Sequence, residues 1–115
     1  MSQPSSLYRF DSKLMPVRRR QMRAIVRHVC KFYHADVDAV LSYSRRAGLI
    51  WPRHVSMAIA AANGFTSATI AAALNRERTI VSYAHKQVLD QCETNSLAND
   101  EVRNLAREIK EKIIK

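Results

Sequence analysis

The spacing of the apolar residues is the feature that most restricts how this chain can fold. Between residues 16 and 33, apolar side chains recur every three or four positions, as they do on one face of an α-helix. The same spacing returns near the C-terminus, and no convincing alternation of the kind found in strands occurs. Only two of the 115 residues are glycine, so little interrupts these stripes. The sequence therefore predicts an all-α protein.

About six helices are expected from these stripes and from the residues between them. The predicted helices cover residues 16–33, 37–43, 52–63, 67–74, 76–92 and 99–114. Pro16 and Pro52 suit the first turn of a helix, because the first N–H groups have no partner inside the helix. Asp36, and either Thr66 or Ser67, suit N-cap positions.

Length and composition indicate one folded domain preceded by an arm. A chain of 115 residues supports a single helical core. Residues 1–14 are polar and contain proline and serine, so we expect a flexible arm there and one domain over 15–115. We expect no secretory signal, and the longest apolar run, 57–62, is too short to span a bilayer. Cys30 and Cys92 have no CxxC spacing, which favours reduced thiols and a cytoplasmic location.

The charge of the chain indicates the class of its partner. Nineteen Lys and Arg against ten Asp and Glu give a net charge of +9. Residues 1–60 hold eleven basic and three acidic side chains, whereas 61–115 hold eight and seven. A positive charge of this size favours nucleic acid or an anionic membrane surface as the partner. Four arginines on the first predicted helix suit salt-dependent, sequence-independent contacts with DNA. They are Arg18, Arg19, Arg20 and Arg23.

Residues 67–92 have the pattern of a helix-turn-helix. A short helix ends at Leu74, Asn75 suits a left-handed turn, and a longer helix with polar residues at its front follows. That front is Arg76-Glu77-Arg78-Thr79. The spacing alone leaves two interpretations: an exposed ion pair at a helix end, or a first turn that contacts DNA bases.

Four segments, taken in order, resemble the C-terminal DNA-binding domain of the bacterial chromosomal replication initiator DnaA. They are "VCKFYHADVDAVLSYSRR", "WPRHVSMAIA", "TSATIAAAL" and "NRERTIVSYAHKQV". The likeness extends over residues 20–113. It implies a helical domain of the Trp-repressor-like class, in which a basic loop enters the minor groove and a recognition helix reads the major groove.

The resemblance also implies a set of DNA-binding residues. Arg45 is similar to the minor-groove arginine of the basic loop, with Arg46 as the alternative if the loop register is shifted by one. Arg53, which follows Pro52, resembles a phosphate-contacting arginine. The family's Arg-Asp-His-Thr falls on Arg76, Glu77, Arg78 and Thr79. Lys86 is a further expected contact because of its charge, since it forms a second basic group with Arg76 and Arg78. Arginine can form a fork with guanine, glutamate can accept from cytosine, and threonine can contact a thymine methyl group, each for about 1–3 kcal/mol of discrimination.

The sequence departs from the family at the positions that read bases. The family's Asp-His-Thr-Thr is replaced by Glu77, Arg78, Thr79 and Ile80. We therefore expect a DNA site that differs from the initiator's usual box. A GxxxxGK[ST] motif does not occur in the 115 residues, so no ATPase activity is expected.

Other functions receive less support from the residues. The basic amphipathic helix 16–33 is also typical of modules that bind an anionic membrane or a protein partner, but its apolar face is needed for the core. No paired carboxylates, activated nucleophile or metal-ligand set is visible, so we expect no enzyme, catalytic residue, metal or cofactor. The expected partner is double-stranded DNA, in replication initiation control or transcription regulation. A replication initiator or the transcription machinery are the further partners considered.

Overall fold

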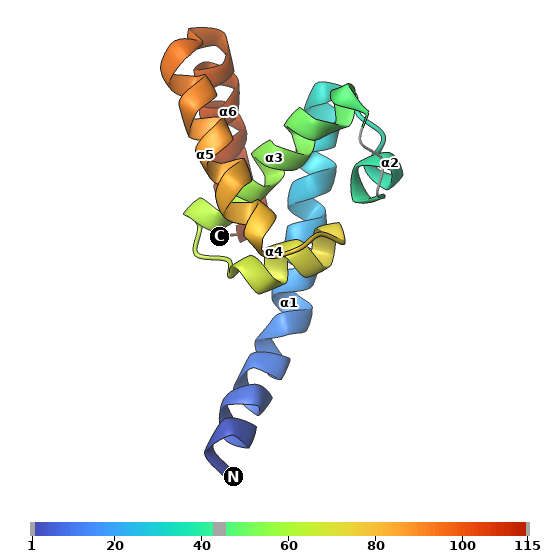
Figure 1. Cartoon of the computed structure of the whole chain (residues 1–115), viewed down its shortest axis with the longest axis vertical. Coiled ribbons are helices and arrows are strands. Elements are labelled where there is room, and N and C mark those ends of the chain that lie inside the picture. The colour runs from blue at the N-terminus through green and yellow to red at the C-terminus, as the bar shows by residue number, and fades with distance from the viewer. Residues whose placement is uncertain (1, 43–45, 115) are drawn as a thin grey trace.

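The computed structural model describes residues 2–42 and 46–114, and the side chains within those ranges from residue 17 onward. These residues form six α-helices and a final π-helical turn, with no strand among them. The elements are α1 (Ser2–Tyr33), α2 (Val37–Leu41), α3 (Ala47–Ala62), α4 (Ser67–Leu74), α5 (Thr79–Thr94), α6 (Ser96–Ile109) and η1 (Lys110–Ile114). In Figure 1 the N-terminal part of α1 extends beyond the body that the other helices form. The all-α fold and the order of the helices are as the sequence predicted.

α1 and α3 supply much of the core. The fully buried apolar residues of α1 are Met22, Ile25, Val26, Val29 and Cys30. Each of them has another member of the set three or four positions away, so together they form one face of the helix. α3 is buried along most of its length because it packs against both α1 and α5. A central helix of this kind is apolar nearly all round, as the alanine-rich sequence of α3 is.

Three helices end with one residue in the left-handed conformation. His34 follows α1 with φ 57°, Gly64 follows α3 with φ 85°, and Asn75 follows α4 with φ 58°. In each case the next N–H donates back into the last turn, and for α4 Arg76 N donates to Ala71 O at 2.9 Å. This arrangement pairs an otherwise free carbonyl and redirects the chain. The left-handed turn predicted at Asn75 is confirmed.

Two predicted N-caps are also confirmed. Asp36 Oδ1 accepts from Asp38 N at 3.2 Å at the start of α2. Of the two candidates before α4, the cap is Thr66, whose Oγ1 accepts from Thr69 N at 3.1 Å. Each cap pairs one of the N–H groups that a helix leaves free at its first turn.

Four helix starts differ from the prediction. α6 begins at Ser96 instead of residue 99, and Asn95 is its N-cap, with its side chain accepting from Ala98 N. α1 begins at Ser2, so helix continues through the segment expected to be an arm, and Pro16 lies within it instead of in its first turn. α3 begins at Ala47, with Pro52 buried inside the helix. A proline there removes one backbone donor but does not end the helix, because the residues around it are held by the core. α5 begins at Thr79 instead of residue 76, because the chain needs further turn residues after Asn75.

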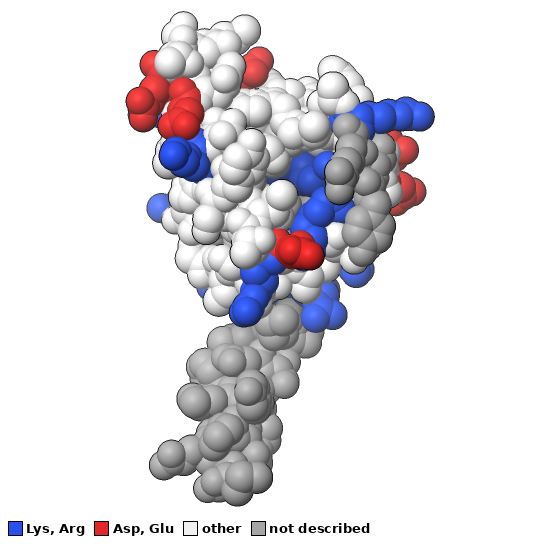
Figure 2. Space-filling view, in the orientation of Figure 1, with Lys and Arg blue, Asp and Glu red and all other residues white. Residues whose placement is uncertain are grey.

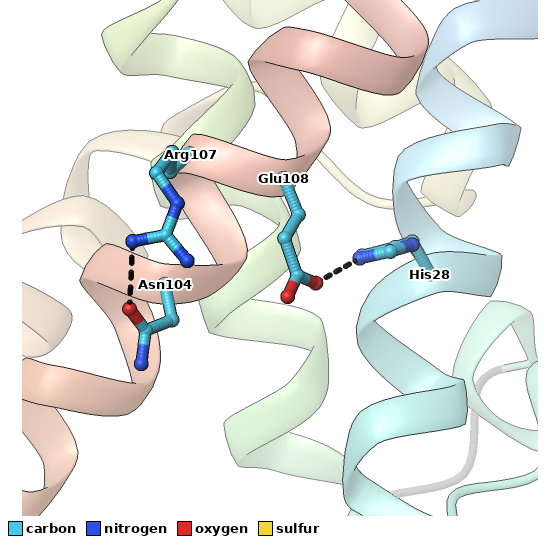
Figure 3. Close-up of polar contacts among 4 residues, drawn as sticks. All are labelled: His28, Asn104, Arg107 and Glu108. Carbon is cyan, nitrogen blue, oxygen red and sulfur yellow. Dashed lines mark hydrogen bonds and ion pairs between the residues drawn. The ribbon is translucent and has the colours of Figure 1, made fainter.

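Polar contacts attach the C-terminal helices to α1. His28 of α1 and Glu108 of α6 point toward one another, with Nε2 and Oε1 2.8 Å apart (Figure 3). This hydrogen bond holds the pKa of Glu108 below its ordinary value. Gln21 Nε2 also donates to Ile113 O at 3.5 Å. Both contacts lie on the side of α1 that faces α6 and η1.

Candidate nucleic-acid interface

α4, residues 75–78 and α5 form the helix-turn-helix that the sequence predicted. The buried residues of α5 are Val81, Ala84 and Val88. Thr79, Tyr83 and Lys86 are exposed on another side of the same helix. Residues spaced four and three apart share a helix face, so these three form one row, called the exposed row below. The row begins at the first residue of α5, where a recognition helix presents side chains to a groove.

A hollow of about 1050 Å³ opens between α3 and the front of α5, and we call it the interhelical hollow. Arg53 and His54 lie on its α3 side, and Asn75, Arg76 and Glu77 lie on the side of the turn. Figure 2 shows basic side chains gathered on this face of the molecule, with acidic atoms beside them. The sequence did not predict a concave site, because its walls come from segments far apart in the chain.

Arg53, expected to contact a phosphate, lies deep in this site. Its side chain is only 5% exposed, and its Nε donates to Val40 O of α2 at 3.0 Å. Burial lowers the pKa of Arg53, and the positive charge of Arg76 lowers it further. The guanidinium is still charged at neutral pH, because the ordinary pKa of arginine lies far above 7. A phosphate contact by Arg53 stays a prediction, and the phosphate would have to enter the hollow.

Arg76 connects the turn to the end of α2. Its Nη2 donates to Ser42 O, which lies 34 positions earlier in the chain. Its Nη1 donates to Leu74 O at 3.3 Å and to Asn75 O at 3.1 Å. Ser42 directly follows α2 and directly precedes residues 43–45 of the basic loop. The side chain of Arg76 therefore joins two segments that were both expected to contact DNA.

Glu77, Arg78 and Thr79 are all exposed at the front of α5. Arg78 occupies the cap position of the helix without a side-chain cap bond, and Thr79 is the first helical residue. Within residues 46–114 the structure shows no ion pair between Glu77 and Arg78. Of the two arginines beside Glu77, Arg78 therefore does not pair with it in this arrangement of the side chains. Base contacts by these three residues stay a prediction.

The basic loop is only partly described. Arg45, the expected minor-groove arginine, belongs to residues 43–45, which lie outside the described residues. Arg46, the alternative, is exposed at the cap position of α3, and its side chain makes no cap bond. It stands at the beginning of the helix that carries Arg53. The loop and the interhelical hollow are therefore connected through one short stretch of α3.

His54 and Tyr83 belong to the site but were not among the predicted contacts. Their rings meet edge to face across the hollow, with centroids 5.9 Å apart and planes at 84°. Burial lowers the pKa of His54, and Arg53 lowers it further, so the imidazole is neutral at pH 7. Tyr83 is 55% exposed. Its spacing of four from Thr79 was the signal in the sequence that places it on the exposed row.

α1 presents a second basic surface. Arg18 is half-buried and contributes less to this surface, because its guanidinium packs on the Phe65 ring, 4.5 Å from the ring centre. The exposed cations are Arg19, Arg20, Arg23, Arg27 and Lys31, which we call the basic face of α1. No Asp or Glu occurs between residues 12 and 35. The positive potential along this part of α1 is therefore not offset by carboxylates of the same helix.

The two cysteines and the other possible metal ligands are dispersed. Cys30 is fully buried, and burial raises the pKa of its thiol to about 11. Cys92 is half-buried, and burial raises its pKa too. Over residues 2–42 and 46–114, no three His, Cys, Asp or Glu side chains are grouped so that they would hold a metal ion.

Comparison with known proteins identifies the segment that carries the helix-turn-helix. A family model described as "Bacterial dnaA protein helix-turn-helix" matches residues 22–88. The match includes the buried part of α1, all of α2, α3 and α4, and α5 as far as its last buried residue. It therefore contains both the interhelical hollow and the exposed row. A search of curated proteins finds no match.

Proposed function

Because this chain belongs to the bacterial DnaA helix-turn-helix family and is therefore a DNA-binding domain, we propose that it binds specific duplex sequences to control replication initiation or transcription, without ATPase activity. The observation that carries the proposal is the front of α5. Exposed polar residues stand there beside a positively charged hollow, in the part of the chain that the family model matches.

Each residue at the front of α5 has a role that its chemistry suits. Arg78 presents its guanidinium to guanine O6 and N7, and Glu77 accepts from cytosine N4. Thr79 places its methyl group against that of thymine. Lys86, at the far end of the exposed row, contacts a phosphate. These contacts differ from those of the Asp-His pair in the family pattern, so the preferred duplex differs from the initiator's usual box.

The other arginines attract and position the DNA backbone. Arg45 or Arg46 enters the adjacent minor groove, where a narrow A·T-rich segment has the most negative potential. Arg53 and Arg76 add positive charge to the interhelical hollow, and their hydrogen bonds to α2 determine where that charge lies. The basic face of α1 adds the part of the affinity that depends on salt and not on sequence.

Selection of bound duplexes from a random library, followed by anisotropy titration, tests the proposal. We expect one preferred sequence, and an affinity that falls steeply between about 50 and 200 mM salt. Arg78→Ala should reduce the preference at one base pair by about 1–3 kcal/mol. Arg103→Ala removes an equally exposed arginine from α6 and should leave the preference unchanged. No enriched sequence, together with binding that does not change with salt, would contradict the proposal.

Membrane binding is the alternative that the basic helix suggested, and the packing of α1 counts against it. A helix that lies on a membrane inserts its apolar face, but Met22, Ile25 and Val26 are 0% exposed. Among the described helices, none has the length and apolar character required to cross a bilayer. Sedimentation with anionic liposomes, at the salt used for duplex titration, tests this alternative. Liposome binding without duplex binding would favour it.

The cellular setting follows from the proposed partner. A protein that binds duplex DNA in replication or transcription control acts at the nucleoid, in the cytoplasm. The partners that fit these two processes are a replication initiator and the transcription machinery. Immunoprecipitation of crosslinked chromatin tests the location, since enrichment of particular chromosomal sites is expected. Recovery of no DNA above the background of an untagged strain would contradict it.

A further inference from the structure

Two arginines from different parts of the chain donate to carbonyl oxygens at the end of α2. Arg53, from α3, reaches Val40 O with its Nε at 3.0 Å. Arg76, from the turn before α5, reaches Ser42 O with its Nη2. The last carbonyls of a helix have no partner inside it and carry the negative end of the helix dipole. Both arginines therefore meet acceptors that suit a cation.

The guanidinium group of Arg76 donates hydrogen bonds to two separate segments of the backbone. While Nη2 donates to Ser42 O, Nη1 donates to Leu74 O and Asn75 O, at the end of α4. One planar guanidinium thus bridges the backbone of the helix-turn-helix and the backbone that leads into residues 43–45. A guanidinium is rigid and its donors point in fixed directions, so it fixes the separation of the groups that it bridges.

We propose that Arg76 is a positioning residue that couples the basic loop to the front of α5, and that it acts through this coupling more than through its own contact with DNA. The inference rests on the proposed function, in which the loop and the front of α5 enter neighbouring grooves. Two elements that must enter two grooves together lose affinity if their separation varies, because ordering them then costs entropy on binding. The bridge by Arg76 fixes this separation in the free protein, so the entropy of ordering the two elements is not lost when DNA binds.

The decisive variant is Arg76→Lys, because it keeps the charge and removes the fork. A phosphate contact by Arg76 would largely survive this change, since lysine also binds phosphate as a point charge. A bridge between Ser42 O and Asn75 O would not survive, because an ammonium group lacks the planar, spaced donors. We expect Arg76→Lys to weaken binding of the preferred duplex about tenfold, with the salt dependence unchanged. Arg103→Lys makes the same exchange on the exposed side of α6; it is the matched control and should bind as the wild type does.

A double-mutant cycle with the loop tests whether Arg76 acts through it. In a background with Arg45→Ala and Arg46→Ala, we expect Arg76→Lys to weaken binding less than about twofold. Equal losses in the two backgrounds would overturn the proposal and indicate an independent contact with DNA. Thermal unfolding of each variant shows that the loss is not a loss of folded protein.

A second measurement on the free protein tests the coupling whether or not the proposed function holds. In two-dimensional NMR spectra, Arg76→Lys should shift the amide signals of Ser42 and Arg46 together with those of Glu77 and Thr79. Signals of α6, such as that of Arg103, should not move. Shifts confined to residues 75–79 would overturn the coupling. If the coupled shifts appear but no duplex is bound, the proposed function fails and the bridge by Arg76 stands.

Discussion

Replacement of Arg53 tests whether its buried side chain stabilises the base of the interhelical hollow. Arg53→Ala removes a buried hydrogen bond from a charged donor to Val40 O, a contact that contributes about 1.5–3 kcal/mol. It also removes buried methylene groups, each of which contributes about 0.8 kcal/mol. Burial of the charge and repulsion from Arg76 oppose these gains, as the lowered pKa of Arg53 indicates. We expect Arg53→Ala to lower the free energy of unfolding by about 3 kcal/mol.

Arg53→Met separates the charge from the packing. Methionine retains most of the unbranched stem and removes the buried charge with its hydrogen bond, so the expected cost is about 1 kcal/mol. Urea unfolding at pH 7, followed by circular dichroism, measures both variants. Arg103→Ala is the control for an exposed arginine and should change the unfolding free energy by less than about 0.5 kcal/mol. An Arg53→Ala variant as stable as the wild type, or Arg53→Met as costly as Arg53→Ala, would refute this account.

Substitutions at three further positions test the turn and the titrating groups. Asn75→Ala should lower the unfolding free energy by about 1–2 kcal/mol more than Asn75→Gly does, because alanine, unlike glycine, is strained in the left-handed conformation; equal effects of the two in thermal unfolding would contradict this reason. The pKa of Cys30 is raised from 9.0 to about 11, so its contribution to stability is complete below pH 9 and is lost as the pH rises toward 11. In urea unfolding, the advantage of the wild type over Cys30→Ala should therefore shrink between those pH values, and a constant difference would contradict it. The hydrogen bond from His28 lowers the pKa of Glu108 from 4.5. The wild type should therefore be more stable than Glu108→Gln above pH 4.5, and this difference should disappear as the pH falls below 4.5. A stability difference that persists in acid would exclude this contact as its source.

Local signals in the sequence predicted much of the fold. The helical stripes indicated the order of the helices, because burial of one face follows directly from spacing. Asn75 and Thr66 were predictable because a left-handed turn and an N-cap depend on one residue and its nearest neighbours. Pro52 was misleading because a proline is also tolerated inside a helix that the core holds. The start of α5 was placed too early because the turn after Asn75 uses residues whose polar character also suits a helix front.

The contacts within the site were less predictable than the elements that carry them. The bond from Arg76 to Ser42 O joins residues 34 positions apart, and no local pattern encodes it. The burial of Arg53 depends on α2 lying against α3, which spacing along the chain does not reveal. By contrast, the exposed positions of Glu77, Arg78 and Thr79 follow from their place between a turn and a helix. The sequence therefore predicted the exposed front of α5 but not the hydrogen bonds that Arg53 and Arg76 donate to the backbone at the end of α2.

The most direct test of the central claim is an exchange of the residues proposed to read bases. The variant carries Glu77→Asp, Arg78→His and Ile80→Thr, which restores the family's pattern at the front of α5. Competition titrations compare the duplex selected by the wild type with the initiator's usual box, using both proteins at the same salt. We predict that the wild type prefers its own selected duplex and that the exchanged protein shifts its preference toward the initiator's box. An unchanged preference in the exchanged protein would contradict the claim that these residues read DNA bases.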